Sequence, residues 1–419
     1  MLRLASGRRP LADRCEVSRE NAPDKARPKL RPIEVIPTTQ GGRRMITLHD
    51  PTGLARGVAS LSPVAFFVVS HFDGRHDLTE IQADFVHRFG QPLPLERIHE
   101  MIEQLEEAGY LDGPQFERHY GQLAERYRNA DTHRARLPLE AQQLEEGLAA
   151  IMADAERTAK GAPVVGIIAP HLDYERGRSC YAAAYGALRR RSAARRFVIL
   201  GTNHFGRARG VVATDKPFET PLGATPIDPQ LMAALRTRCG QALLEHQFDH
   251  QHEHSVELQI MLLQKVYGPE RIHIVPLLCP DACDAEDESD VARPSLTDVA
   301  EALRDAIGQS SDPICIVAGA DFSHVGRRFG DDRDLDPDFL QEVEQHDRLF
   351  LHHIEQNDPE GMLHWLRQAR NPTRVCSSGC LYIALAALPD ARVELLKYHQ
   401  AASPEIETAV TSAALVLTH

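Results

Sequence analysis

The chain has 419 residues, of which 42% are apolar and 26% charged, a mixture typical of a globular protein with a sizeable core. Its 60 acidic residues outnumber the 47 basic ones, and the formal net charge of −13 argues against a nucleic-acid-binding surface. No run approaches the roughly 18 apolar residues of a membrane span, and the N-terminus lacks the apolar core of a signal peptide. We therefore expect a cytoplasmic protein that binds neither nucleic acid nor membrane and keeps its eight cysteines reduced.

The first part of the chain predicts a disordered tail and then a small separate module. Residues 1–32 are rich in arginine and are expected to be the tail. Residues 33–112 combine an extended start with three short helices, in "LSPVAFFVVSHFDG", "DLTEIQADFVHRFG" and "PLERIHEMIEQLEEAGYL". This arrangement resembles the PqqD-like winged-helix family, whose members bind peptides; a docking or dimerisation module is the alternative. Residues 113–144 are expected to be a linker with a connecting helix.

Residues 145–419 alternate between strands and helices, as in an α/β domain. Continuous apolar runs, typical of strands buried on both faces, occur in "VVGIIAP", "RFVILG", "HIVPLLC", "ICIVAG" and "VELLKYHQ". Helices are expected in "SCYAAAYGALRRR" and over 229–238, 255–267, 295–309, 337–356 and 377–388. We expect one mixed, largely parallel sheet flanked by helices, preceded by the small winged-helix-like domain.

Three of these strands end on residues that can carry chemistry. The first ends at His171, the second at His204, and the run "ICIVAGADFSH" at Asp321 and His324. Ligands of open α/β sheets bind at the carboxyl ends of the strands, which lie about 4.8 Å apart, so two of these histidines can meet at one ion. The alternative is that each histidine is an ordinary hydrogen-bonded turn residue.

Two later segments offer further candidates. In "HEHSVELQ", His254 and Glu257 lie where a helix begins and can reach the strand-end site, whereas the neighbouring histidines are expected to be solvated loop residues. Cys376 in "RVCSSGC" precedes another helix, whose dipole stabilises a thiolate. The pairs Cys279/Cys283 and Cys376/Cys380 have a spacing that is poor for structural zinc.

The ordered stretches "IIAPHLDYERGRSCYAAAY", "FVILGTNHFG", "FETPLG", "HEHSVELQIMLL", "GADFSHVGRRF" and "VCSSGC" resemble the Memo family, the B component of the bacterial AmmeMemoRadiSam gene set. The resemblance implies a fold related to class III extradiol dioxygenases. It implies a metal site of two histidines and a cysteine, here His171, His204 and Cys376, holding Fe(II) in preference to Cu or Zn. His324 would act as acid and base beside Asp321, and His254 would line the pocket.

The sequence departs from the family pattern beside two of these ligands. "PHLDY" replaces the usual "PHAGY", so that Asp173 adds a carboxylate, and Asn203 lies in "GTNH" where "GPSH" is usual. We count Asp173 and Asn203, with His254 and Glu257, as residues of the substrate pocket.

The leading hypothesis is a non-haem iron oxidoreductase, dioxygenase-like, that acts on a small organic or peptidyl substrate, with His324 moving protons and Asp321 orienting it. The first alternative is a zinc-dependent hydrolase at the same residues. The second is a peptide-binding scaffold without catalytic activity. The resemblance also implies a radical-SAM enzyme and an AMMECR1-like protein as partners.

Overall fold

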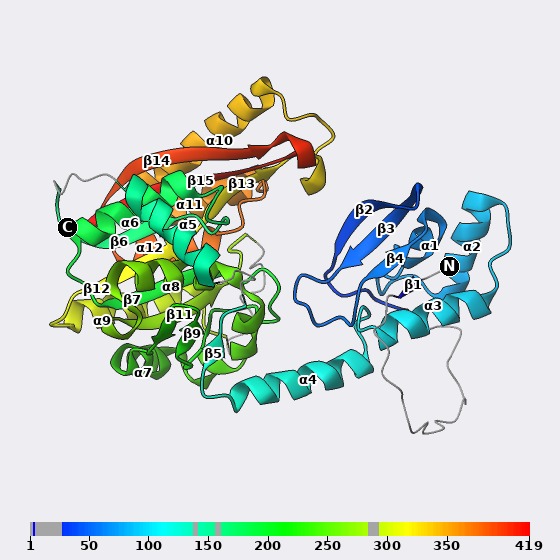
Figure 1. Ribbon diagram of the computed structural model, residues 1–419, viewed down its shortest axis with the longest axis horizontal. Helices are drawn as coiled ribbons and strands as arrows, with labels where there is room; N and C mark the ends of the chain where they lie inside the picture. The colour runs from blue at the N-terminus through cyan, green and yellow to red at the C-terminus, as the bar shows by residue number, and fades with distance from the viewer. Residues whose placement is uncertain (1–2, 5–26, 137–140, 156–160, 284–292) are drawn as a thin grey trace. The chain divides into compact units, whose positions relative to one another are not determined.

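The computed structural model describes residues 3–4, 27–136, 141–155, 161–283 and 293–419. The chain divides into two compact units, Met1–Asn129 and Ala130–His419, which Figure 1 shows in blue to cyan and in cyan to red. Among the described residues, no helix is both long and apolar enough to cross a membrane.

Within its described residues, the first unit contains a small antiparallel sheet and four helices. Its strands are β1 (Arg3–Leu4), β2 (Glu34–Gln40), β3 (Arg43–His49) and β4 (Ala59–Leu61), in the order β1-β4-β3-β2. Its helices are α1 (Pro63–Val69), α2 (Leu78–Phe89), α3 (Leu95–Glu107) and α4 (Pro114–Arg128). The three expected short helices are confirmed, and α4 is a helix within the segment expected to link the domains. The winged-helix assignment stays a prediction.

Caps and turns explain the boundaries in this unit. Ser62 accepts a hydrogen bond from the N–H of Ala65 at the start of α1, and Asp77 forms a capping box with Glu80 at the start of α2. Gly90 ends α2 in a left-handed conformation, with φ 66°. In the expected tail, Arg3–Leu4 pairs with β4, residues 5–26 lie outside the described residues, and Arg31 is buried.

The second unit is built on an eight-stranded mixed sheet, as expected. Its strands are β6 (Val164–Ala169), β7 (Arg196–Thr202), β8 (Val212–Ala213), β11 (His273–Cys279), β12 (Ile314–Gly319), β13 (Asp321–Val325), β14 (Arg392–Ser403) and β15 (Thr408–Thr418). The order is β13-β15-β6-β12-β7-β11-β8, with β14 paired to β15. Strands β6, β12, β7 and β11 are parallel, and β15 runs antiparallel to β6. A smaller sheet joins β10 (Gly223–Thr225), β9 (Phe218–Thr220) and β5 (His133–Arg134).

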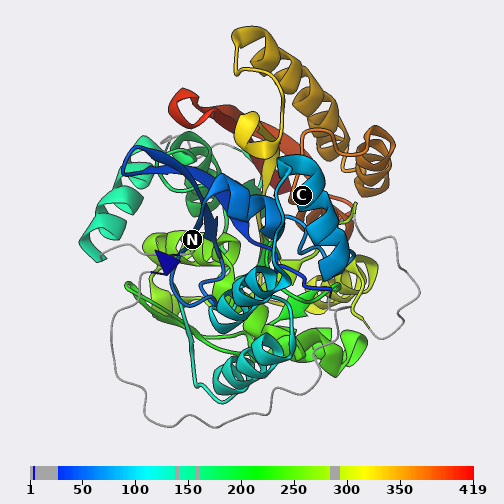
Figure 2. The ribbon, with the colours of Figure 1, turned by 90° about the vertical axis from the view of Figure 1, so that its right-hand side faces the viewer.

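Helices cover both faces of the large sheet. One face, with Ile167 and Ile199, packs against α5 (Ala141–Asp154), α6 (Arg178–Arg191) and α8 (His254–Tyr267). The other face, with Ile168 and Leu200, packs against α7 (Pro229–Cys239), α9 (Leu296–Gln309), α10 (Pro337–Glu355), α11 (Pro359–Ala369) and α12 (Ser378–Ala387). Burial on both sides explains why the central strands are continuous apolar runs. The long hairpin β14–β15 extends from the sheet beside α10 (Figure 1), and the turned view shows the same neighbours (Figure 2).

Candidate metal centre

Two strand ends and one helix start bring three potential metal ligands together. His171 follows β6, His204 follows β7, and Cys376 precedes α12; β12 lies between β6 and β7. Their ligand atoms all lie within 4.8 Å of one another, and the Sγ of Cys376 is 3.6 Å from the Nε2 of His171. Tetrahedral bonds of ordinary length to one ion would place a sulfur and a nitrogen about 3.5 Å apart. The spacing therefore fits a shared ion.

The backbone of β12 sets the orientation of His171. The ring Nδ1 lies 3.1 Å from the carbonyl oxygen of Gly319, which can only accept, so Nδ1 carries the proton and Nε2 holds the lone pair. The main-chain N–H of His171 donates to the Oδ1 of Asp321 at 3.0 Å. Both the ring and the backbone of His171 are thus held in a ligand-competent arrangement.

A buried carboxylate orients His204. The Nδ1 of His204 is 3.0 Å from both carboxylate oxygens of Glu253, and its main-chain N–H donates to the same group at 2.9 Å. Although burial opposes the charged forms, the ion pair raises the pKa of His204 well above its usual value and lowers that of Glu253. Such carboxylate–histidine pairs fix metal-ligating imidazoles, with Nε2 left for the ion. We did not expect Glu253 from the sequence, although it directly precedes His254.

The turn that carries His204 is fixed by a second buried carboxylate. The Oδ2 of Asp249 accepts hydrogen bonds from the main-chain N–H groups of Arg207 and Ala208 and from the Nδ2 of Asn203. The Oδ1 of Asn203 accepts from the N–H of Gly206 at 3.0 Å. A Cβ atom at Gly206 would overlap the side chains of Asn203 and Asp249, so this tight turn requires glycine. Asn203 therefore stabilises the conformation of the turn that carries His204.

Cys376 has a perturbed thiol. Burial raises its pKa, but the His171 and His204 imidazoles outweigh this effect and lower the value to about 6. Cys376 also lies two residues before α12, where the helix dipole favours a thiolate. Among the described residues, no other cysteine belongs to a cluster of three potential metal ligands, and the buried Cys279 and Cys380 lie in the core.

Asp321 lies beside this cluster, and it does not orient His324 as expected. The Nδ1 of His324 is 3.0 Å from the carbonyl oxygen of Phe322 and 3.1 Å from that of Arg374, so these carbonyls orient the ring. Asp321 instead binds the backbone of His171, and its Oδ2 is 3.5 Å from the Nε2 of that residue. Burial raises the pKa of Asp321 to about 6 and lowers that of His324. Two backbone carbonyls therefore fix the tautomer of His324, and the expectation that Asp321 does so is wrong.

The other residues predicted to line the pocket differ in whether they border the three potential ligands. The His254 ring stacks on that of His204 at 5.4 Å and lies edge-on to His171 at 5.6 Å, so it borders the cluster. Glu257 is 3.2 Å from the Nε2 of His133 and accepts the N–H of Arg136. Asp173 is exposed and pairs with Arg176. His254 is thus adjacent to the predicted ligands, while the contacts of Glu257 and Asp173 are with other residues.

Comparison with known proteins finds relatives along most of this chain. The family model of Memo-like proteins matches residues 136–416. A MEMO1 family protein of Aquifex aeolicus is 25% identical over 386 residues, covering 90% of this chain and 96% of the relative. A second, from Thermus thermophilus, is 27% identical over 343 residues, covering 81% and 98%. A third, from Methanopyrus kandleri, is 30% identical over 237 residues, covering 56% and 75%.

The first two alignments are longer than the matched family region, so they extend into the first unit of this chain. The family model covers most of the second unit, including all three residues of the candidate metal centre and every strand of the large sheet except the last two residues of β15. The chain belongs to the Memo family.

Proposed function

We propose that this chain is a metal-dependent oxidoreductase, dioxygenase-like, that uses a non-haem iron ion at His171, His204 and Cys376 to act on a small organic or peptidyl substrate. The observation that carries the proposal is the convergence of these three ligand atoms within 4.8 Å. Two imidazoles and one thiolate leave coordination positions open, as in catalytic rather than structural sites. Such an ion, when bound, would supply the activation of oxygen.

The chain's own residues have separable roles in this proposal. Gly319 and Glu253 orient the two imidazoles, and Cys376 contributes a thiolate. His324 has its Nδ1 engaged with backbone carbonyls, so its Nε2 is the nitrogen that accepts or returns a substrate proton. Burial keeps His324 neutral at pH 7, the form needed for a general base.

Anaerobic reconstitution with iron(II), followed by an oxygen-uptake assay, tests this proposal. The wild-type chain is expected to retain iron and consume oxygen, and His204→Ala to lose both properties. His352→Ala, a change at an exposed histidine of α10, is the matched control and should behave as wild type. Failure of the wild type to retain iron, or equal uptake by His204→Ala, would contradict the proposal.

The thiolate favours one alternative at the same residues, a zinc-dependent hydrolase, because sulfur is a common zinc ligand. Metal analysis of protein purified under reducing conditions separates the two candidates. One zinc ion per chain with no redox response would support hydrolysis, with His324 as the general base.

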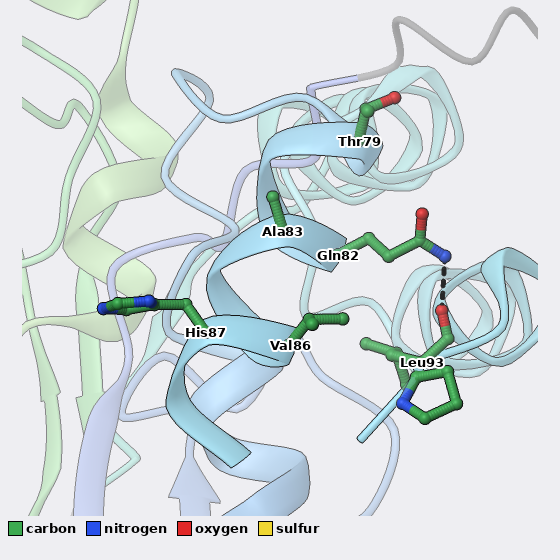
Figure 3. A pocket seen from close by; sticks show the side chains of 7 residues that line it. Thr79, Gln82, Ala83, Val86, His87 and Leu93 are labelled. Carbon is green, nitrogen blue, oxygen red and sulfur yellow. Dashed lines mark hydrogen bonds between the residues drawn. The ribbon is translucent and has the colours of Figure 1, made fainter. Parts of the chain in front are cut away.

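A hollow in the first unit favours peptide binding there as a second function. It lies on α2 and the segment before α3, has a volume of about 640 Å³, and is lined by Thr79, Gln82, Ala83, Val86, His87, Pro92 and Leu93. Figure 3 shows Val86 and Leu93 facing it, while the Nε2 of Gln82 donates to the carbonyl of Leu93. Val86 is 43% exposed, so apolar surface is available to a partner.

Val86→Asp tests this second function, because it places a charge in the hollow while leaving the metal centre intact. Substrate affinity, read as KM for a peptidyl substrate or as binding of a candidate peptide, should fall more than kcat. Val64→Asp, a change at an equally exposed valine on α1, is the control. An equal loss in both variants would contradict a specific peptide site.

A further inference from the structure

Three hydrogen bonds join His324 to the segment that leads to Cys376. The main-chain N–H of His324 donates to the carbonyl of Thr373 at 2.7 Å. The ring Nδ1 of His324 donates to the carbonyl of Arg374 at 3.1 Å, and the carbonyl of His324 accepts from the Nε of Arg374 at 2.9 Å. Both the main chain and the ring of His324 are therefore held by the residues just before Cys376.

The main chain of Arg374 has a left-handed conformation, with φ 58°. A residue that carries a Cβ atom seldom adopts this conformation and keeps it only where neighbouring contacts hold it. The guanidinium provides two such contacts, because its Nε binds the carbonyl of His324 and its Nη2 binds the Oδ2 of Asp331. The same Oδ2 accepts the main-chain N–H of Gly326, directly after β13, at 2.7 Å. The side chain of Arg374 thus holds its own carbonyl toward the ring of His324.

A separate pair of hydrogen bonds fixes the main chain next to Cys376. The Oδ1 of Asn371 accepts from the N–H of Val375 at 2.8 Å, and the Nδ2 of Asn371 donates to the carbonyl of Val375 at 2.9 Å. Neither bond involves the side chain of Arg374. Loss of that side chain should therefore disturb the ring of His324 and leave Cys376 in place.

The ring of His324 is within electrostatic range of the candidate metal centre. Burial lowers the pKa of His324, the Asp321 carboxylate opposes this effect, and the His204 imidazole adds to it. Asp321 itself binds the main chain of the ligand His171. The orientation of the His324 ring therefore decides how its Nε2 is presented to a substrate at that centre.

We propose that Arg374 is a positioning residue: its guanidinium holds its left-handed main chain, so that its carbonyl fixes the Nδ1–H tautomer of His324 and leaves Nε2 free to take a proton. The inference rests on the proposed function for the role of His324 as the base. The tautomer itself depends on hydrogen bonds alone and can be measured without metal. In this arrangement the segment that supplies the thiolate also orients the base.

Nitrogen NMR of the metal-free full chain with labelled histidine tests this inference, at a pH where His324 is neutral. Loss of a signal in His324→Gln assigns the residue. In Arg374→Gln the ratio of the Nδ1–H to the Nε2–H tautomer should fall at least threefold, since the carbonyl of Phe322 remains as a second acceptor. Arg374→Gly should stay within twofold of the wild type, because glycine adopts a positive φ without a side-chain contact.

Arg370→Gln is the matched control, because Arg370 is another left-handed arginine, with φ 56°, but its side chain is exposed. The tautomer ratio in this variant should equal that of the wild type. An unchanged ratio in Arg374→Gln, or an equal fall in Arg374→Gly or Arg370→Gln, would overturn the inference. If Arg374→Gln does not fold, Asp331→Asn replaces it, since it removes the charge that anchors the guanidinium. An unchanged ratio in that variant would overturn the inference in the same way.

Iron content and oxygen uptake of the same variants separate this inference from the proposed function. Arg374→Gln should keep the iron content of the wild type and lose at least threefold in kcat for oxygen uptake. The expected tautomer change in a chain that retains no iron would reject the metal centre and keep the positioning role of Arg374. An iron-loaded, active chain whose His324 tautomer does not respond to Arg374→Gln would do the reverse.

Discussion

Each unit contains a buried carboxylate paired with a cationic side chain. The two pairs differ in what the remaining nitrogen atoms of the cationic side chain contact. In the first unit, Asp50 binds Arg31, whose remaining donors reach the carbonyl of Gly109 and the hydroxyl of Thr52. In the second unit, Glu253 binds the Nδ1 of His204. The other ring nitrogen of His204 serves the cluster with His171 and Cys376. A buried pair whose hydrogen-bonding groups have partners within the same unit is structural, whereas a pair that directs a ring nitrogen toward other potential metal ligands indicates a binding site.

Removal of Asp50 gives the largest expected effect, because it leaves the Arg31 charge buried and unpaired. Asp50→Ala should lower the free energy of unfolding of the first unit by about 3–5 kcal/mol. The sole tryptophan, Trp365, lies in the second unit, so its fluorescence in urea should keep its midpoint while circular dichroism detects earlier unfolding. Asp112→Ala, which breaks an exposed pair with Lys29, should cost less than about 1 kcal/mol. Equal effects of both variants would contradict a structural role for Asp50.

A methyl group at Gly206 should disturb the second unit and its ligand turn together. Gly206→Ala is expected to cost about 1–3 kcal/mol, because the new Cβ overlaps the Asn203 and Asp249 side chains. Urea unfolding followed by Trp365 fluorescence measures the cost, and metal titration should show weaker binding. Gly308→Ala in α9, where a Cβ has open space, should leave metal binding unchanged. Full metal affinity in Gly206→Ala would show that the turn does not position His204.

Glu253→Gln tests whether the carboxylate tunes the metal ligand. Loss of such a partner lowers metal affinity by about 10–100-fold, and competition titration with a chelating dye measures it. Glu257→Gln is the matched control: it changes a buried carboxylate of α8 that also pairs with a histidine, His133. Its metal affinity should equal that of the wild type. A similar loss in both variants would point to general destabilisation instead.

The smallest expected effect concerns the pH dependence of the first unit's free energy of unfolding. Burial raises the pKa of Asp50, but Thr52, Arg31 and Ala55 together lower it below its usual value. The unfolded chain then takes up a proton that the folded chain does not. The resulting stability is present above about pH 4 and is lost as pH falls through the folded pKa. Asp50→Asn should remove this part of the acid dependence from urea titrations, and an unchanged slope would contradict it.

The central strands of the second unit could be predicted from the sequence because strands buried on both faces are continuous apolar runs. The runs that form β6, β7, β11 and β12 are apolar on both faces, and their ends placed His171 and His204. Strand β15 was not expected, because its buried stretch contains threonine and serine residues that depend on tertiary partners. Thr411, for example, donates to Asp347, 64 residues away in sequence. The short helix α11 was also missed.

The candidate site was predictable in its ligands but not in its supporting groups. His171, His204 and Cys376 lie at element ends that the sequence makes visible. Glu253 acts on His204 from 49 residues away, and nothing in its local pattern distinguishes it from Glu257. Asp321 lies three residues before His324, but the irregular pairing of β13 with β15 separates their roles. The ring of His324 contacts the carbonyl of Arg374, whereas Asp321 accepts from the backbone of His171. Long-range hydrogen bonds decide these roles.

Elemental analysis of the full chain, purified without oxygen, tests the central claim most directly. We predict one iron ion per chain in the wild type and less than a tenth of that in Cys376→Ser, while Cys239→Ser, a change at a partly buried cysteine of α7, keeps the wild-type content. A wild-type chain that carries no metal, or equal metal content in Cys376→Ser, would contradict the account.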